Sequence, residues 1–292
     1  MAKCITCGQA LRYHRRYTFA SPNFRKIYRG SKVFRCTGCG LSQADLSLVD
    51  DAALTQYYAA DYRVSAQIGV LGETSAAIYR RRGAALAALA ARFLPAPPQR
   101  VFEVGAGYGF NLRAFAAQDP AVWLGTDEIS GVALATHGEQ IQQASLDDGP
   151  YDVVVLSHVL EHFADPKAML DRVHAAVSPE GVVVIEVPND IDGVIKYNGR
   201  DEPHLTFFEL ETLRPLLMAS GFAVLELHAA GPDNVRDTPA TRAKRALRWL
   251  ITAVPLTNAL FQRRAAMRIG GDRRFDGPNP TGVFLRAVLR KA

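Results

Sequence analysis

The stretch Val-Phe-Glu-Val-Gly-Ala-Gly-Tyr-Gly, residues 101–109, decides the fold of this chain. Its apolar residues before the first glycine form a short run that is typical of a buried parallel strand. Glycines follow at every second position, Gly105, Gly107 and Gly109, and permit a sharp turn and a close approach of the backbone to a ligand. A helix-compatible run over residues 110–117 comes next. The stretch therefore predicts a strand, a glycine loop and a helix, with a ligand held on N–H groups of the loop.

The spacing of the glycines helps to identify that ligand. A dinucleotide-binding loop needs glycine or alanine five residues after its first glycine, and that position is Phe110. A phosphate-binding Gly-Lys-Ser/Thr sequence does not occur in the chain. Glu103 stands two residues before the first glycine, which gives the pattern Glu-x-Gly-x-Gly-x-Gly. A nicotinamide dehydrogenase is therefore disfavoured.

The composition indicates a globular protein with segregated charge. Of the 292 residues 48% are hydrophobic, and no apolar run reaches the length of a membrane span. Residues 1–8 show no signal peptide, so we expect a cytoplasmic protein. The net charge of +5 conceals two basic segments: residues 1–40 carry nine Lys/Arg and no Asp/Glu, and residues 236–274 carry ten against two. These segments either meet an anionic partner or form solvated surface.

The four cysteines form two matching Cys-x-x-Cys-Gly units. Two-residue gaps let both thiolates of one turn bind a single tetrahedral ion, and the following glycine relieves the turn. The sequence therefore predicts a structural Zn²⁺ site in an N-terminal zinc ribbon, with no open position for chemistry. Its ligands would be Cys4, Cys7, Cys36 and Cys39.

Arginines and lysines alternate with aromatic residues between the two cysteine units, over residues 12–35. Such a mixture can bind RNA through phosphate contacts and stacking. It can equally hold an acidic acceptor such as a sugar nucleotide, or pack its aromatic rings inward. All three interpretations stay open, with nucleic acid the less favoured.

Strands alternate with helices after the glycine loop, which predicts a doubly wound sheet with ligands at its carboxyl edge. An acid ends the second strand, where one carboxylate can accept hydrogen bonds from both hydroxyls of a ribose. Asp127 is favoured over Glu128 for this role, and surface acids before a helix cap are the alternative. The predicted strands are 101–104, 121–126, 139–143, 152–156, 182–187, 222–227 and 283–289, the last two paired antiparallel.

Two further motifs sharpen the interpretation. The sequences Leu-Ser-His-Val-Leu-Glu-His-Phe-Ala-Asp-Pro (156–166) and Glu-Val-Pro-Asn (186–189), together with the glycine loop, resemble class I S-adenosylmethionine (SAM)-dependent methyltransferases. The resemblance is to a subgroup with an N-terminal zinc ribbon, which includes deoxysugar C-methyltransferases and relatives from glycan and antibiotic pathways. It implies a Rossmann-like sheet of seven strands, with the glycine loop at the amino-acid end of SAM and Ser145–Leu146 near the adenine. The implied cofactor-binding residues are Glu103, Gly105, Ala106, Gly107, Gly109, Asp127, Glu128, Ser145, Leu146, Ser157 and His158.

The resemblance also implies where the methyl acceptor binds. His204 is a candidate general base, with Glu202 and Tyr197 as further catalytic candidates. The sugar C-methyltransferases have an Asp-Glu-His run here, whereas Pro203 interrupts it in this chain. A capping box over residues 206–209 is expected to fix the start of the next helix. A purely structural histidine is the alternative interpretation.

His158 and His162 are rival candidates for the base. They lie four residues apart, which on a helix would put both on one face. We expect His158 to line the methyl-donor pocket and His162 to be mostly structural. The two could bind a metal ion together, but the sequence shows no third ligand.

The predicted organisation has three parts: a zinc ribbon (1–45), a linker and helical cap (46–98), and a methyltransferase domain (99–292) with a basic helical insertion at about 232–280. Residues 242–264 of the insertion are expected to be helical, as a pocket cover, a dimer contact or a peripheral membrane contact. The function expected is methyl transfer to a small molecule, a sugar, nucleotide sugar or glycan intermediate. An RNA methyltransferase and a non-catalytic zinc-dependent interaction protein are the alternatives.

Overall fold

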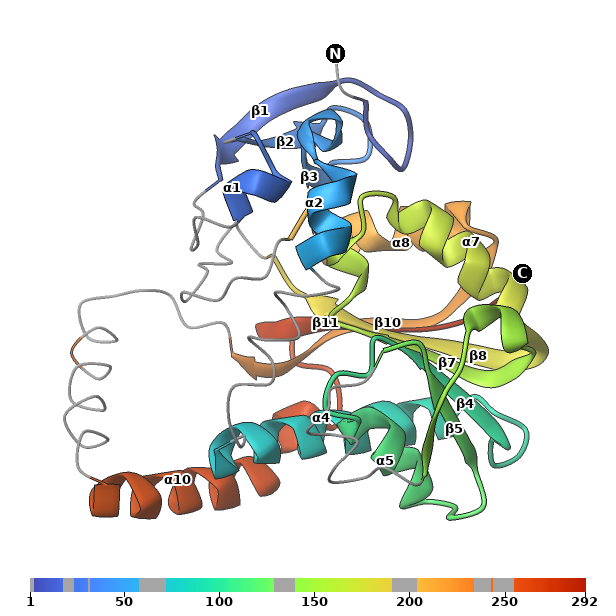
Figure 1. Cartoon of the computed structure of the whole chain (residues 1–292), viewed down its shortest axis with the longest axis vertical. Coiled ribbons are helices and arrows are strands. Elements are labelled where there is room, and N and C mark those ends of the chain that lie inside the picture. The colour runs from blue at the N-terminus through green and yellow to red at the C-terminus, as the bar shows by residue number, and fades with distance from the viewer. Residues whose placement is uncertain are drawn as a thin grey trace.

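The computed structural model describes residues 3–17, 24–30, 32–57, 72–128, 140–190, 204–233, 243 and 255–292. Two sheets organise these residues, a small N-terminal sheet that lies above a large central one (Figure 1). No helix in the described ranges combines the length and apolar character needed to cross a bilayer.

The central sheet has seven strands in the order β10-β11-β8-β7-β4-β5-β6. Neighbouring strands from β6 to β8 pair in parallel, whereas β11 pairs antiparallel with both β8 and β10. The doubly wound sheet and its antiparallel final pair are thus confirmed. The strands are β4 (Arg100–Val104), β5 (Trp123–Thr126), β6 (Ile141–Gln143), β7 (Tyr151–Ser157), β8 (Val177–Pro188), β10 (Phe222–Asp233) and β11 (Gly282–Lys291).

Helices cover both faces of this sheet because its buried strands are apolar on both sides. In β4 and β7, alternate residues enter opposite cores: Phe102 and Val154 belong to one, Val101 and Val153 to the other. One face carries α7 (Pro166–Ala176) and α8 (Leu210–Ala219), and the other carries α4 (Glu73–Ala91), α5 (Phe110–Ala116) and α10 (Pro255–Gly270) (Figure 1).

The N-terminal sheet takes its fourth strand from a distant part of the sequence. Its order is β1-β2-β3-β9, and β9 follows the whole parallel part of the central sheet in sequence. Its strands are β1 (Leu11–Arg16), β2 (Lys32–Cys36), β3 (Ser42–Ala44) and β9 (Thr206–Phe207), and the short helices beside it are α1 (Phe24–Ile27), η1 (Leu46–Leu48) and α2 (Asp51–Gln56). The remaining 3₁₀ turns are η3 (Leu146–Asp148), η4 (Leu160–His162) and η6 (Arg273–Phe275).

One local prediction is wrong, and another is confirmed in part. Thr206 does not cap a helix, because it is paired with Gln43 in a strand, and α8 instead begins after Glu209, whose backbone N–H donates to Thr212 Oγ1 at 3.0 Å. Of the helix expected over residues 242–264, residues 255–264 are helical as part of α10 (Pro255–Gly270), which runs on beyond the expected end. Most of the earlier part of that expectation lies outside the described residues.

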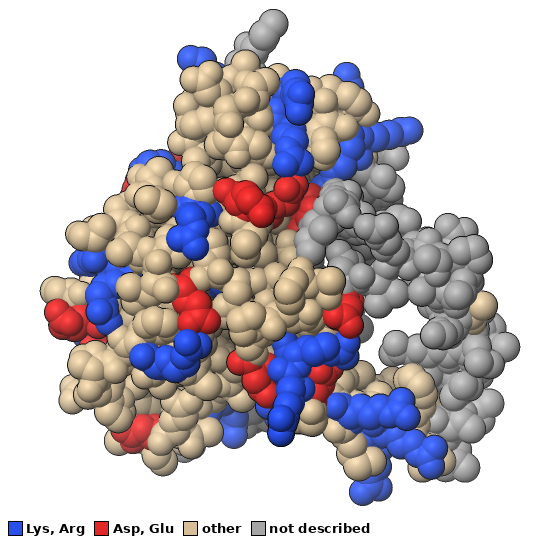
Figure 2. All heavy atoms as spheres, turned by 180° about the vertical axis from the view of Figure 1, so that it is seen from behind, with Lys and Arg blue, Asp and Glu red and all other residues tan. Residues whose placement is uncertain are grey.

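The basic character expected near the C-terminus is visible on α10. Arg263, Arg264 and Arg268 are exposed there, and basic side chains gather along the edge that this helix forms at the lower right of Figure 2.

Candidate functional site

The glycine loop lies at the carboxyl edge of the central sheet, between β4 and α5. Gly105, Gly107 and Gly109 all have left-handed backbone conformations, with φ of 61°, 53° and 71°, which side chains with a Cβ rarely adopt. The N–H of Ala106 donates to Thr126 Oγ1 at 3.2 Å, which joins the loop to the end of β5. The sequence therefore forms the predicted strand, glycine loop and helix.

Asp127 and Glu128 directly follow β5, and they differ in exposure and in the hydrogen bonds that they make. The exposed Asp127 turns toward the glycine loop, where its Oδ1 accepts from the N–H of Gly105 at 2.8 Å. The half-buried Glu128 donates its backbone N–H to Thr126 Oγ1 at 3.2 Å. After the neighbouring strand β6, Ser145 caps η3 and Leu146 is buried. All of these residues lie on one edge of the sheet, although their roles stay predictions.

Glu103 is buried beneath the loop, near the end of β4. Asn111 of α5 donates to its Oε1 at 2.6 Å. Burial raises the pKa of Glu103 to about 8, since the charged form loses the stabilisation of water. In the absence of ligand this side chain is therefore mostly protonated at neutral pH.

A buried charged triad lies beside the loop. Glu186 of β8 accepts from Arg82 Nε at 2.6 Å through one oxygen and from Arg286 Nε at 2.7 Å through the other. Burial alone would raise its pKa, but the two guanidinium groups lower the pKa of Glu186 to about 2. Arg82 also donates to Ser157 Oγ at 3.0 Å, so α4 is fastened directly to the carboxyl edge.

A cluster of three histidines and one glutamate follows β7. His158 adopts a left-handed conformation with φ of 57°, and its Nδ1 lies 3.5 Å from Glu161 Oε1. The Nε2 atoms of His162 and His204 each lie 3.8 Å from that same oxygen. The backbone N–H of Leu205 donates to the carbonyl of Glu161 at 2.8 Å, which holds the two segments together. Sequence separation had concealed that His204 joins the two earlier histidines.

His204, the predicted base, is 5% exposed. Burial, with His162 and His158 beside it, holds its pKa well below the ordinary value, so the imidazole is neutral at pH 7. The other two catalytic candidates, Tyr197 and Glu202, lie outside the described residues.

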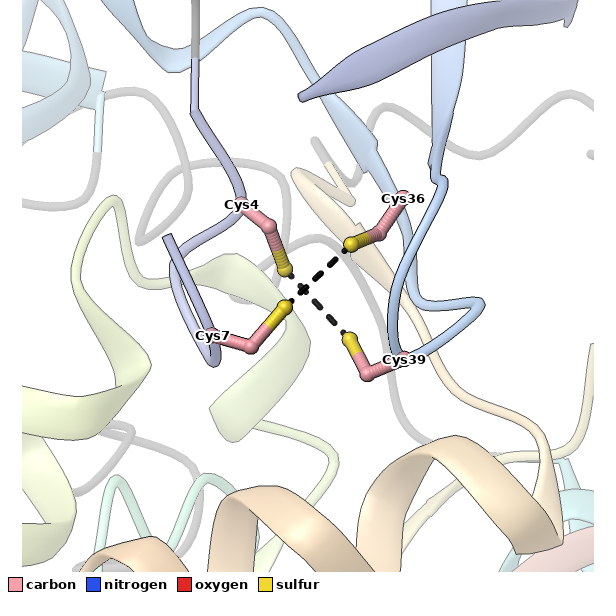
Figure 3. A group of neighbouring side chains, drawn as sticks. All are labelled: Cys4, Cys7, Cys36 and Cys39. Atoms are coloured by element: carbon pink, nitrogen blue, oxygen red, sulfur yellow. Dashed lines mark hydrogen bonds between the residues drawn. The ribbon is translucent and has the colours of Figure 1, made fainter. Parts of the chain in front are cut away.

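The four cysteine sulfurs converge between two turns (Figure 3). Cys4 Sγ and Cys39 Sγ are 3.5 Å apart, and Cys7 Sγ and Cys36 Sγ are 3.4 Å apart, far longer than a disulfide bond of about 2.05 Å. Four sulfurs at about 2.3 Å from one tetrahedral ion would lie about 3.8 Å apart, so small adjustments accommodate the ion. All four cysteines are free thiols.

The glycines after the two cysteine pairs have the backbone expected of such turns. Gly8 and Gly40 are left-handed, with φ of 70° and 76°. Burial opposes ionisation of Cys36, but backbone N–H groups of Cys39 and Gly38 and the neighbouring thiols lower the pKa of Cys36 to about 7. The donor set and its surroundings therefore suit a metal that binds thiolates.

The N-terminal sheet is docked against the histidine cluster. The Tyr17 hydroxyl donates to the carbonyl of His204 at 2.8 Å, and the N–H of Ala44 donates to the carbonyl of Leu205 at 2.8 Å. Arg15 pairs with Asp190 at 2.8 Å, and Arg35 makes two hydrogen bonds to Glu209 at 3.0 and 3.1 Å. The segment that carries His204 thus lies between η4 and the cysteine-bearing sheet.

Sequence reasoning missed several of these residues. Arg82 stands in an alanine-rich helix, where an arginine is ordinarily exposed, and nothing near it indicates a buried partner. A signal was present for Glu186, since a charged residue inside an otherwise apolar strand needs a partner. Asn111 and Glu161 lie beside predicted site residues but had no assigned role.

The sequence matches a known protein family and a curated relative, each over part of its length. The methyltransferase domain family matches residues 78–227. The ubiquinone biosynthesis O-methyltransferase of Psychrobacter arcticus is 23% identical over 159 residues, which cover 49% of this chain and 52% of that protein. The chain thus matches about half the length of this relative.

Solved structures share the fold. The plantazolicin methyltransferase BpumL in complex with S-adenosylhomocysteine (SAH) superposes with a TM-score of 0.50 at 14% identity, over 82% of this chain and 93% of that chain. Its complex with a monoazolic desmethylPZN analog and SAH gives the same TM-score and identity, over 82% and 94%. The fold is that of a class I methyltransferase, as predicted. Because the family match spans more than half of the 292 residues, the chain belongs to the methyltransferase domain family.

Proposed function

We propose that this protein transfers a methyl group from SAM to a small-molecule acceptor, a sugar, nucleotide sugar or glycan intermediate. One observation carries the SAM-binding part: the Asp127 carboxylate and the left-handed glycine loop meet at the carboxyl edge of the sheet. The loop offers backbone N–H groups, and the carboxylate can accept from both ribose hydroxyls after it leaves Gly105. Glu103 lies under the loop, where the ammonium of the amino-acid end would bind.

The chemistry needs little beyond orientation and removal of a proton. When bound, SAM supplies a methyl group on a sulfonium centre that is already activated. His204 is neutral and can accept a proton from the acceptor, and the Glu161 carboxylate 3.8 Å from its Nε2 would stabilise the imidazolium formed. We assign His204 as the general base on this ground.

The sugar-type acceptor rests on the sequence resemblance to deoxysugar and glycan-pathway methyltransferases. The similarity to an O-methyltransferase supports oxygen as the atom that receives the methyl group. The cysteine site is proposed to hold a structural Zn²⁺, because four thiolates leave no open position on a tetrahedral ion. The structure offers less support for an RNA methyltransferase, since Arg15 and Arg35 of the basic segment are paired internally.

Calorimetric titration of the metal-loaded protein with SAM, SAH and NAD tests the cofactor. We expect heat with SAM and SAH and none with NAD. Asp127→Ala and Gly107→Val should bind SAH at least about tenfold more weakly, because the first loses charged hydrogen bonds and the second cannot adopt the required φ. Asp171→Ala, which changes an exposed acid on α7, is the control. Wild-type protein that binds neither nucleoside would overturn the assignment.

A screen of nucleotide sugars and glycan intermediates, with production of SAH as the readout, then tests the acceptor. His204→Ala should retain SAH binding and lose turnover. Full turnover in that variant would show that His204 is not the base.

A further inference from the structure

We propose that Glu161, His162 and His204 form a second metal site, for a divalent transition metal ion such as Zn²⁺ or Co²⁺. One ligand atom from each residue lies within 4.8 Å of the other two. Two imidazole nitrogens, His162 Nε2 and His204 Nε2, face the same carboxylate oxygen at 3.8 Å. Ligands at about 2.1 Å from a tetrahedral ion would lie about 3.4 Å apart, so movements below an ångström close the site.

The ligand types select the class of ion. Imidazole suits zinc, cobalt, iron, copper and nickel, whereas calcium and magnesium prefer all-oxygen sites. Two histidines and one carboxylate on a divalent ion leave at least one position open, unlike the closed set of four cysteines. The second site therefore differs from the first in both chemistry and accessibility to a small ligand.

The surroundings favour a cation at this place. The Glu161 carboxylate is fully buried, and its Oε1 lies 3.5 Å from His158 Nδ1 and 3.8 Å from the Nε2 atoms of His162 and His204. A carboxylate oxygen and two imidazole nitrogens that face one another in this way are ligands that a divalent transition metal ion accepts. A divalent ion would bind the carboxylate oxygen and both Nε2 atoms.

The backbone holds two of the ligands in place before any ion arrives. Glu161 and His204 come from segments joined by the 2.8 Å hydrogen bond from Leu205 N–H to the Glu161 carbonyl. The Tyr17 hydroxyl holds the His204 carbonyl at 2.8 Å from the other side. Preorganisation of this kind lowers the cost of gathering ligands around an ion.

The site lies next to the glycine loop. Val159, between His158 and η4, packs on Gly105 so closely that a Cβ there would lie 3.2 Å from its methyl group. An oxygen bound at an open position of the ion would have a lowered pKa. In the metal-loaded protein, where Nε2 of His204 is a ligand and cannot accept a proton, the ion would promote loss of the proton from the acceptor in place of that nitrogen. This consequence rests on the proposed function, whereas metal binding itself does not.

Cobalt titration of the full-length protein, its cysteine site already loaded with Zn²⁺, tests the proposal. We expect one added equivalent of Co²⁺, counted by elemental analysis after desalting, with visible absorption but without the intense charge-transfer bands of cobalt thiolates. Glu161→Gln and His204→Ala should each lower Co²⁺ affinity by about tenfold or more. His174→Ala, which alters a histidine packed on Phe222 outside the cluster, should bind like wild type.

Three outcomes would overturn the second site: no added cobalt in the wild type, wild-type cobalt affinity in both cluster variants, or thiolate bands that place the cobalt at the cysteines. Circular dichroism and SAH calorimetry on the same samples keep the result separate from folding and from the methyl-transfer proposal. A variant that binds SAH normally but has lost the cobalt supports the site independently of turnover.

Discussion

Two carboxylates buried a short distance apart along the sheet edge have opposite protonation states. Glu186 lies between two guanidinium groups, which lower its pKa to about 2. Glu103 accepts a hydrogen bond from the neutral amide of Asn111, and burial raises its pKa to about 8. Neighbouring charge therefore decides the state of each buried acid. The first carboxylate anchors structure, and the second is able to exchange its proton for a cationic ligand.

This difference predicts a pH dependence of cofactor binding. In the proposed binding mode the ammonium of SAH pairs with the charged carboxylate of Glu103, so binding between about pH 6.5 and 8 must displace the proton of that side chain. Affinity should rise with pH in that window by at most about tenfold per unit, and it should level off above the pKa. Calorimetry at several pH values measures it. Glu103→Gln should bind weakly with a flatter profile, and a wild-type profile equal to that of the variant would contradict the prediction.

The stability of the folded protein depends on pH in the opposite direction to cofactor affinity. The pKa of Glu103 in the folded protein, about 8, exceeds the ordinary value of 4.5, so the folded state holds the extra proton. Its contribution to the free energy of unfolding is fully present below pH 4.5 and is lost as the pH rises through 8.

The triad around Glu186 predicts a large loss of stability. Arg286→Met should lower the free energy of unfolding by about 3–5 kcal/mol, because it leaves a buried carboxylate with one partner fewer. Arg92→Met is a matched control, since Arg92 is 60% exposed and pairs with Glu226 at 2.9 Å. We expect about 0–1 kcal/mol there. Urea denaturation compares the two, and equal losses would show that the triad adds nothing.

At the scale of elements, α4 determines how the glycine loop is supported. Arg82 fastens it to β8, and the adjacent Gly83 lets it approach α5 so closely that a Cβ would lie 2.6 Å from the Phe110 carbonyl oxygen. Because α5 also carries Asn111, the contact between the helices positions the side chain that holds Glu103.

Gly83→Val should therefore disturb both folding and binding. We expect a loss of about 1–3 kcal/mol in the free energy of unfolding, typical of overpacking, and weaker SAH binding. Ala84→Val changes the neighbouring exposed position and should cost less than about 1 kcal/mol with normal binding. Thermal denaturation measures the stability of the two variants, and calorimetry measures their affinity for SAH. Normal SAH affinity in Gly83→Val would show that α4 does not support the glycine loop.

The sequence predicted those elements whose signals are local. The strand, glycine loop and helix at 101–117 were expected because apolar residues and glycines lie together there. Thr206 was misassigned because its strand exists only through pairing with Gln43, far away in the sequence. The partnership of Arg82 with Glu186 depends on the packing of a helix on a sheet, which no local pattern encodes.

For the whole molecule, the two sheets are connected at the histidine cluster. Residues at the N-terminal sheet donate hydrogen bonds to the carbonyl groups of His204 and Leu205, and β9, the fourth strand of that sheet, follows these two residues immediately. Disturbance of the cysteine site should therefore reach His204 before it reaches the parallel strands.

Removal of the metal proposed at the cysteines tests this order. After chelation, hydrogen exchange should accelerate at residues 3–17, 32–44 and 204–208, while β4 and β7 stay protected, because each of these two strands is hydrogen-bonded to a parallel strand on both sides. Cys36→Ser should behave in the same way without chelator. Uniform acceleration would show that the molecule unfolds as one unit, and unchanged exchange would show that the thiols bind no structural ion.

The late origin of β9 has a consequence for biosynthesis. During translation β1, β2 and β3 leave the ribosome early. The edge of β3 that pairs with β9 stays unpaired until Thr206 and Phe207 have been translated. During that interval an open strand edge is available for mispairing with other nascent chains. A fragment of the first 45 residues carries every cysteine but lacks β9, so the edge of β3 would stay unpaired. We therefore expect this fragment to aggregate more readily than the intact polypeptide.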